Sequence, residues 1–204
     1  LLYHQLAWAY DGIAALVSAG QWKNWALSVL PDLTGNRILE LGHGPGHLQA
    51  ALLKKDVFVI GVDKSPQMSR QAYRRLRKPG FQKQPGLVHG DACHLPFAQG
   101  SFDQVVATFP THYITMHNTL SEVHRVLSAA GELVVIPGAR LTAPRGVAER
   151  LASGIFRLFG LSQDWSELAR AWFVVPIQRA GFQVSVERRP FKSGEIFVIL
   201  GKKG

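Results

Sequence analysis

The amino-acid sequence predicts an α/β protein with a doubly wound, mostly parallel sheet of seven strands that ends in an antiparallel C-terminal hairpin. Short apolar segments alternate with segments of helical periodicity through five units, and this alternation is typical of parallel strands covered by helices on both faces. A glycine-rich turn follows the first apolar segment. The last two apolar segments are joined by a link too short for a crossover, so they must pair antiparallel.

Five segments are predicted as parallel strands because they are short, apolar and bounded by charged residues or glycine. They are residues 37–41, 57–63, 87–89, 102–109 and 132–136. Three helices are predicted between them, at residues 47–55, 65–78 and 119–127. Ser65 followed by Pro66 is the pattern of a helix N-cap with proline at the first helical position.

The two ends of the chain complete this organisation. We expect a helical cap at residues 1–34, rich in aromatic side chains, and a main domain at residues 35–204. Within the main domain, residues from about 141 to 175 are predicted as a helical insertion, and residues 182–187 and 195–200 as the hairpin.

The length and composition limit the class of protein. The chain has 204 residues, 47% of them hydrophobic, which suits one domain with a small cap. Its single cysteine, Cys93, excludes an internal disulfide, fits a reducing compartment, and is assigned to packing rather than to chemistry. No run of 18 apolar residues occurs, so no membrane span is predicted. We expect a cytoplasmic protein with no metal site, and keep a peripheral membrane contact through the 141–175 insertion as an alternative.

The net charge of +9 is the unusual bulk property of the sequence. No acidic residue occurs between Asp63 and Asp91, while seven basic residues do. These are Lys64, Arg70, Arg74, Arg75, Arg77, Lys78 and Lys83. Such a field favours an anionic partner, for example RNA, although few aromatic residues that could stack on bases accompany it. We therefore prefer a solvated helix face.

The stretch RILELGHGPGHLQA, from Arg37 to Ala50, holds the glycine-rich turn. In the dinucleotide-binding pattern G-x-G-x-x-G/A, the third small position would fall on His47, which is too bulky. A phosphate-binding P-loop is disfavoured because no G-K-[ST] follows. The spacing that fits is an acid followed by three alternate glycines, namely Glu40, Gly42, Gly44 and Gly46.

This spacing resembles the first motif of the class I S-adenosylmethionine-dependent methyltransferases. Further motifs of that family follow in the same order, so that the resemblance covers Arg37 to Ile136, about half of the chain. They are Val62-Asp63 with Ser65, Pro66 and Met68; Gly90-Asp91-Ala92 with Leu95-Pro96-Phe97; Ser101-Phe102-Asp103; and Glu122 to Leu127 followed by Gly131 to Ile136. Within the family the motifs are most similar to the ubiquinone/menaquinone-biosynthesis-like group of small-molecule methyltransferases.

The resemblance departs from the family in two places. The turn before the fifth strand reads Ser128-Ala-Ala-Gly131 instead of the usual K-P-G-G. His43 stands where small residues are common, and is expected to narrow the entrance for the cofactor.

The resemblance implies a Rossmann-like methyltransferase fold that binds S-adenosylmethionine and releases S-adenosylhomocysteine. It implies that the three glycines let the backbone approach the methionine part, that Glu40 orients the cofactor amino group, and that Asp63 accepts hydrogen bonds from the ribose hydroxyls. Asp91 would bind the adenine amino group. The expected cofactor-binding residues are Glu40, Gly42, His43, Gly44, Gly46, Asp63, Lys64, Met68, Asp91, Ala92, Thr108 and Phe109.

The methyl acceptor is expected to be small and apolar or aromatic, because the segments that would face it are rich in aromatic residues. Tyr10, Trp22, His112 and Tyr113 are the expected substrate-binding residues. His112 is also the candidate general base for an acceptor that must lose a proton. Three alternatives stay open: an RNA methyltransferase that uses residues 64–83, a noncatalytic S-adenosylmethionine-binding module and, last, a dinucleotide oxidoreductase.

Overall fold

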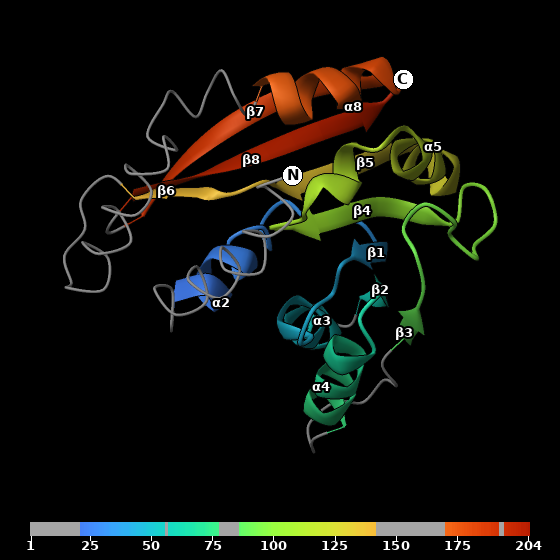
Figure 1. The fold of residues 1–204 in the computed structure, drawn as a ribbon, viewed down its shortest axis with the longest axis vertical. Coiled ribbons are helices and arrows are strands. Elements are labelled where there is room, and N and C mark those ends of the chain that lie inside the picture. Colours follow the sequence, from blue (N-terminus) through green and yellow to red (C-terminus); the bar gives the residue numbers. More distant parts are fainter. Residues whose placement is uncertain (1–20, 56, 78–85, 142–169, 192–193) are drawn as a thin grey trace, which may run out of the picture.

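A single mixed sheet forms the centre of the computed structural model, which describes residues 21–55, 57–77, 86–141, 170–191 and 194–204 (Figure 1). Its strands are β1 Arg37–Leu41, β2 Phe58–Asp63, β3 Gly86–His89, β4 Phe102–Thr108, β5 Leu127–Ile136, β6 Ala139–Leu141, β7 Phe182–Phe191 and β8 Gly194–Lys203. Strands β3, β2, β1, β4 and β5 lie side by side in that order, and every neighbouring pair among them is parallel. The parallel half of the predicted sheet is therefore confirmed.

The C-terminal half of the sheet is antiparallel, as predicted. Strands β7 and β8 pair along their full lengths, and β8 also runs antiparallel to β5. Strand β7 occupies one edge of β8 along the whole length of β8. The other edge of β8 is shared: β6 pairs with it at residues 194–196, and β5 pairs with it at residues 199–202. The eight strands consequently make a sheet that is seven strands wide.

Helices cover both faces of the sheet and enclose two apolar cores. One core lies under α2 Gln21–Leu27 and α3 His47–Leu53, and includes Ile38 of β1. The other lies under the 3₁₀ helix η1 His112–Thr115, α5 His117–Val126 and α8 Val175–Arg179, and includes Leu39. The neighbouring residues Ile38 and Leu39 face different cores because side chains alternate along a strand. Within the described residues, no helix combines the length and the apolarity that crossing a membrane requires.

Helix α4 Pro66–Leu76 begins as its sequence predicts. The side chain of Ser65 accepts a hydrogen bond from the backbone N–H of Met68, at 3.3 Å, and Pro66 takes the first helical position. This capping satisfies a donor that would otherwise lack a partner in the first turn. Most of the predicted cap and of the 141–175 insertion lies outside the described residues. The described part of the cap holds α2, and the described ends of the insertion hold β6 and the π-helical turn η2 Arg170–Val174.

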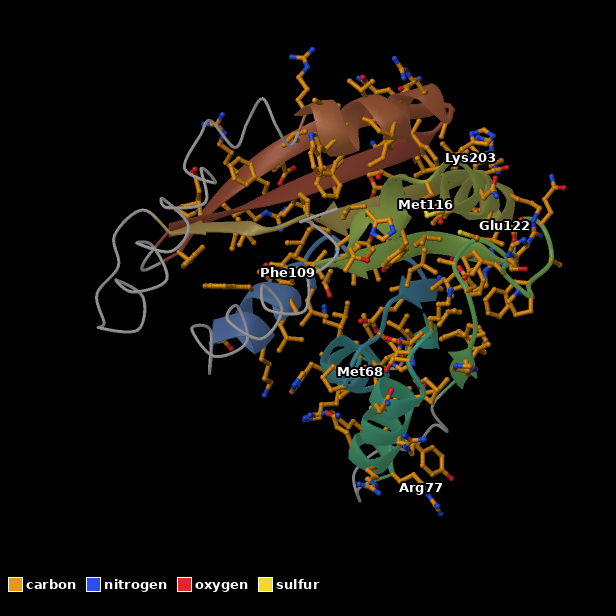
Figure 2. All side chains as sticks on the ribbon, in the orientation of Figure 1. Met68, Arg77, Phe109, Met116, Glu122 and Lys203 are labelled. Carbon is orange, nitrogen blue, oxygen red and sulfur yellow. The ribbon has the colours of Figure 1, made fainter. Side chains whose placement is uncertain are left out.

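The expected turn at 128–131 belongs instead to β5, which begins at Leu127 directly after α5. The pairing with β4 passes from Phe102 opposite Leu127 to Gln104 opposite Glu132, so four residues of β5 bulge opposite one residue of β4. The ammonium group of Lys203, at the end of β8, donates to the carbonyls of His124 and Leu127, at 2.7 and 2.8 Å (Figure 2). Lys203 thus supplies donors to one carbonyl in the last turn of α5 and to the residue that follows the helix.

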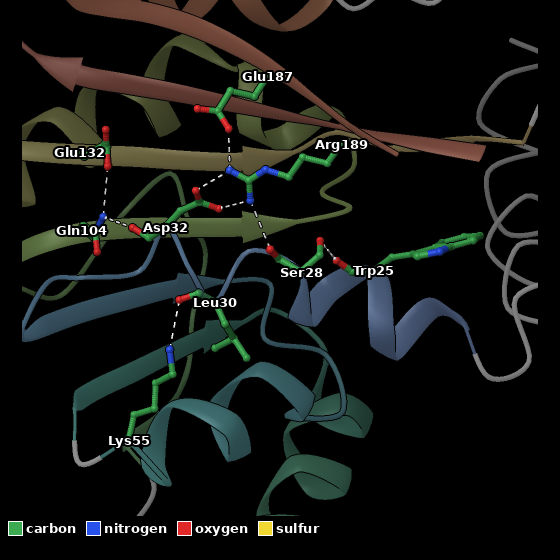
Figure 3. Close-up of polar contacts among 9 residues, drawn as sticks. All are labelled: Trp25, Ser28, Leu30, Asp32, Lys55, Gln104, Glu132, Glu187 and Arg189. Carbon is green, nitrogen blue, oxygen red and sulfur yellow. Dashed lines mark hydrogen bonds and ion pairs between the residues drawn. The ribbon is translucent and has the colours of Figure 1, made fainter. Parts of the chain in front are cut away.

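The segment after α2 is tied to the sheet by Asp32 (Figure 3). Two guanidinium nitrogens of Arg189 on β7 donate to the two carboxylate oxygens of Asp32, each at 2.6 Å. Arg189 also pairs with Glu187 at 2.6 Å. The side-chain amide of Gln104 on β4 donates to the backbone carbonyl of Asp32 at 2.8 Å. These contacts hold α2 and the residues after it against the strands.

Candidate cofactor and acceptor site

The glycine-rich turn lies between β1 and α3, at the carboxyl edge of the parallel strands. Gly42, Gly44 and Gly46 all have left-handed backbone conformations, with φ angles of 68°, 52° and 78°. Residues with a Cβ rarely adopt this left-handed region of φ and ψ, whereas glycine does so at no steric cost. The alternate glycines of the motif therefore meet a backbone requirement of this turn.

The surroundings of the three glycines differ. A Cβ at Gly42 would lie 2.7 Å from the hydroxyl of Tyr113, and a Cβ at Gly46 would lie 2.9 Å from the Cβ of Ala72. Gly46 is thus the point at which α3 and α4 approach each other. A Cβ at Gly44 would meet no atom within 4 Å. The open side of Gly44 is the part of the turn that an approaching ligand could contact.

Asp63, the last residue of β2, holds this turn. Its Oδ2 accepts the backbone N–H of Gly44 and its Oδ1 accepts that of Ser65, both at 2.8 Å. The side chain is half-buried, and each carboxylate oxygen has a second lone pair that could accept a hydroxyl. This geometry fits the expected role of Asp63 toward a ribose.

Arg75 also stabilises the turn, although in the sequence it is only one of the basic residues between Lys64 and Lys83. Its Nε donates to the carbonyl of Pro45 over 2.7 Å, from the penultimate position of α4. Nothing in the local spacing distinguishes Arg75 from the neighbouring arginines, because its partner lies 30 residues earlier.

Glu40 and His43 lie behind the turn, buried at 2% and 3% exposure. The Oε2 of Glu40 accepts a hydrogen bond from the side-chain amide of Gln49 on α3, at 2.8 Å. Burial raises the pKa of Glu40 to about 8, against the opposing effect of the Gln49 amide, and the charge of Asp63 adds to the rise. Nδ1 of His43 lies 2.8 Å from the carbonyl oxygen of Gly44, and burial lowers the pKa of this imidazole.

Asp91 and Lys64 meet beside Asp63. Strand pairing places His89 opposite Asp63, and the N–H of Gly90 donates to the carbonyl of Asp63 at 3.1 Å. Lys64 donates to Oδ2 of Asp91 at 2.7 Å, and the backbone N–H of Cys93 donates to Oδ1 at 3.0 Å. The hydrogen bond from Lys64 is the main reason why the pKa of Asp91 is lowered to about 2. Asp91 is therefore ionised at neutral pH.

The remaining expected cofactor residues lie around this edge. Ala92 is half-buried against the core under α5, and Met68 is half-buried in the first turn of α4. Thr108 ends β4, also half-buried. Figure 2 places Met68 on α4 and Phe109 at the end of β4, beside α2.

Phe109 is the one non-glycine residue with a positive φ among the described residues, at 52°. Strained backbone of this kind is concentrated at functional sites. The centroid of its ring lies 6.4 Å from that of Trp25 on α2, and Trp25 lies 5.0 Å from Phe191 at the end of β7. We call Trp25, Phe109 and Phe191 the aromatic wall.

The residues expected to bind the acceptor are placed in different surroundings. His112 is exposed at the start of η1. Tyr113 donates its hydroxyl to the carbonyl of Leu41 at 3.1 Å, and burial raises the pKa of this phenol, so it stays protonated at neutral pH. Tyr10 and the side chain of Trp22 lie outside the described part of the chain. Phe191 could not be identified from the sequence, because its contact with Trp25 joins residues far apart in the chain.

The Leu95-Pro96-Phe97 loop is held by α5. Glu122 accepts the N–H of Leu95 at 2.7 Å, and Arg125 donates to the carbonyls of Leu95 and Phe97 at 3.0 and 2.6 Å. Glu122 and Arg125 also pair with each other at 2.7 Å. Two of the motifs noted in the sequence are therefore parts of one contact.

The thiol of Cys93 lies 3.3 Å from the hydroxyl of Thr119. Cys93 is a free cysteine. Among the described residues no three His, Cys, Asp or Glu side chains form a group that could hold a metal ion.

Comparisons with known proteins agree with this geometry. A family model described as a methyltransferase domain matches residues 38–131. The demethylmenaquinone methyltransferase of Symbiobacterium thermophilum is 30% identical over an alignment of 199 positions, gaps included, which covers 93% of this chain and 73% of that protein. The chain belongs to the class I S-adenosylmethionine-dependent methyltransferases. The enzyme of the same name from Clavibacter sepedonicus is 31% identical over an alignment of 221 positions, gaps included, which covers 99% of this chain and 89% of that protein.

Solved structures show the same fold. A methyltransferase from Aquifex aeolicus superposes with a TM-score of 0.66 at 17% identity, over 95% of this chain and 98% of that one. The predicted fold class, family and enzyme class are thereby confirmed, as is S-adenosylmethionine as cofactor. The roles assigned to individual site residues of this methyltransferase stay predictions.

Proposed function

We propose that this methyltransferase transfers the methyl group of S-adenosylmethionine to a small aromatic acceptor of the quinol class. The aromatic wall carries the proposal. Trp25, Phe109 and Phe191 bring three flat apolar faces together beside the carboxyl end of β4, next to the cofactor turn. Aromatic side chains suit a planar ring because they stack on it face to face with an offset or edge to face.

The residues that would hold the cofactor line the carboxyl edge of β1, β2 and β3. In the proposed site the open side of Gly44 faces the methionine part, and Asp63 accepts the ribose hydroxyls. Asp91, ionised and held by Lys64, accepts the adenine amino group. When bound, the cofactor supplies a methyl group on a positively charged sulfur, which needs no further activation.

The protein has two further tasks in this proposal. The first is alignment, because a direct displacement needs the acceptor atom, the methyl carbon and the sulfur in line. The aromatic wall orients the ring of the acceptor for this purpose. The second is removal of a proton from a phenolic or carbon acceptor, which we assign to His112 at the exposed start of η1.

A small acceptor is favoured over RNA by two observations. The relatives reported above are named for menaquinone chemistry. Two of the arginines in and after α4 are also engaged within the protein: Arg75 holds Pro45, and the guanidinium of Arg77 lies 5.2 Å from the centre of the Tyr73 ring. This use of the basic residues fits a structural role.

The test compares three acceptors, namely a demethylmenaquinol analogue, a simple phenol and RNA, with transfer of a labelled methyl group as the signal. We expect turnover of the quinol. Trp25→Ala and Phe191→Ala should each raise its KM about tenfold, the loss of one aromatic contact together with its buried area. Trp172→Ala is the control, since this exposed indole on η2 lies outside the wall. Turnover of RNA, or cofactor binding without any turnover, would contradict the proposal.

A further inference from the structure

Three polar side chains are buried together behind the cofactor turn. Glu40 comes from β1, His43 from the turn and Gln49 from α3, with exposures of 2%, 3% and 0%. Gly61 of β2 makes room for two of them. A Cβ at Gly61 would lie 2.8 Å from Nε2 of Gln49 and 2.9 Å from Cβ of His43. Glycine at this strand position therefore permits the group to pack.

Two atoms of this group have no hydrogen-bond partner: Oε1 of Gln49 and Nε2 of His43. Nδ1 of His43 faces the carbonyl oxygen of Gly44, which only accepts, so Nδ1 carries the imidazole proton. Nε2 is then an acceptor, as Oε1 of Gln49 always is. Two buried acceptors without donors are costly, so the group lacks a proton that it could use.

A protonated carboxyl at Glu40 supplies that proton. The charged or titratable groups that act on Glu40 and His43 are Asp63 and Tyr113, and neither is a cation. The oxygen and nitrogen of a side-chain amide exchange places by a half-turn. With the Gln49 amide turned over, the Glu40 hydroxyl donates to Oε1, so that one of the two acceptors gains a donor and all three groups are neutral.

We propose that protonated Glu40, Gln49 and His43 act as one positioning unit, which fixes Gly44 for the cofactor. His43 holds the carbonyl of Gly44 from inside, while Asp63 holds its N–H from the side of β2. Glu40 acts through this unit on Gly44, whereas the resemblance implied that it orients the cofactor amino group. The inference rests on the proposed cofactor site.

A pH dependence follows. The pKa of Glu40 is about 8, so the carboxyl loses its proton above this pH and adds an anion near Asp63. At pH 9 about a tenth of the molecules would keep the proton, and the affinity for a ligand that requires it would fall about tenfold. A glutamine at position 40 keeps an N–H donor at every pH and removes this dependence.

The experiment is a calorimetric titration with S-adenosylhomocysteine at pH 6.5 and pH 9. We expect the wild type to lose about tenfold in affinity between the two pH values, and Glu40→Gln to bind equally at both. His43→Ala should bind about tenfold more weakly at pH 6.5, the effect of losing one buried hydrogen bond. Glu132→Gln is the matched control, because Glu132 also accepts from a glutamine, Gln104, but lies away from the turn. It should keep the wild-type pH dependence.

A different result is expected if Glu40 acts as an anion. If Glu40 contacts the cofactor as an anion, Glu40→Gln binds at least tenfold more weakly at both pH values while the wild type shows no change. A carbon NMR titration of the Glu40 carboxyl without ligand separates this inference from the proposed site. A carboxyl that is protonated at pH 6.5 supports the unit even if no ligand binds, and an ionised one overturns it.

Discussion

Gly44 donates its backbone N–H to the carboxylate of Asp63 over 2.8 Å, which joins the middle of the glycine turn to the end of β2. The second oxygen of Asp63 accepts the N–H of Ser65 at the same distance. Both oxygens are thus used before any ligand arrives, and the carboxylate that would bind a ribose also shapes the turn beside it. Cofactor affinity and turn geometry should therefore change together.

Asp63→Asn tests this coupling. An asparagine side chain accepts with one atom and presents an N–H₂ group to the other backbone N–H, so one of the two contacts becomes repulsive. We expect Asp63→Asn to bind S-adenosylhomocysteine at least tenfold more weakly than the wild type does, and Asp63→Ala to bind it no better than Asp63→Asn. Calorimetric titration measures both, and NAD is the control ligand. An asparagine variant with wild-type affinity would show that the carboxylate has neither role.

Gly44→Ala should separate ligand binding from backbone strain, with Gly100→Ala as the matched variant. Both glycines have positive φ angles, 52° and 69°, and a Cβ at either would meet no atom within 4 Å. Each alanine should cost about 1 kcal/mol of unfolding free energy, the strain of left-handed backbone. Only Gly44→Ala should also weaken S-adenosylhomocysteine binding, by tenfold or more, because its Cβ points to the open side of the turn. Equal affinities in the two variants would place the cofactor elsewhere.

Arg189→Leu should destabilise the protein by about 2 kcal/mol, since it leaves Asp32 without its two charged donors. It should also raise the KM for the acceptor, because Asp32 anchors the segment that carries Trp25. Urea denaturation measures the first effect and steady-state kinetics the second. Arg188→Leu is the control: Arg188 is exposed and its guanidinium lies 5.8 Å from the centre of the Phe197 ring. Equal stabilities of the two variants would contradict the assigned role.

Lys64→Gln should raise the pKa of Asp91 from about 2 toward its ordinary value, because the hydrogen bond from Lys64 is the largest cause of the shift. A carboxyl whose pKa is lowered on folding stabilises the protein above its unfolded pKa, and this contribution is lost as the pH falls from about 4 through about 2. The change in unfolding free energy should be slight, since Lys64 is well exposed and solvent screens the pair. A carbon NMR titration of Asp91 measures the shift, and an unchanged pKa would contradict this explanation.

Local patterns predict the parallel half of the fold and the start of α4. The strand at Phe58–Asp63 is apolar and β-branched, and Ser65 with Pro66 marks the following helix. The start of β5 is not predictable in this way, because no glycine or proline separates Leu127 from α5. Strand β6 is set by its pairing with residues 194–196 of β8, more than fifty residues away. Such elements depend on tertiary pairing rather than on local propensity.

Some features of the candidate site likewise follow from the sequence, whereas others depend on contacts between distant elements. That Asp63 and the glycine turn share one edge follows from the order of the strands. Alternation along β1 also places Glu40 on the same side as the buried Ile38. The contacts with Gln49 and Arg75 and the pairing of Trp25 with Phe191 could not be read from the sequence. Each joins side chains of different elements, and no residue type or spacing identifies such a partner.

The position of β8 also bears on the order in which the protein can fold. Strand β7 comes earlier in the chain than β8, yet among the described strands it pairs with β8, which separates it from β5. During synthesis β7 must therefore wait for a strand that has not yet been made, while β1 to β5 can already associate. Its side chains Glu187, Arg188 and Arg189, followed by Pro190, discourage pairing with another chain during that interval.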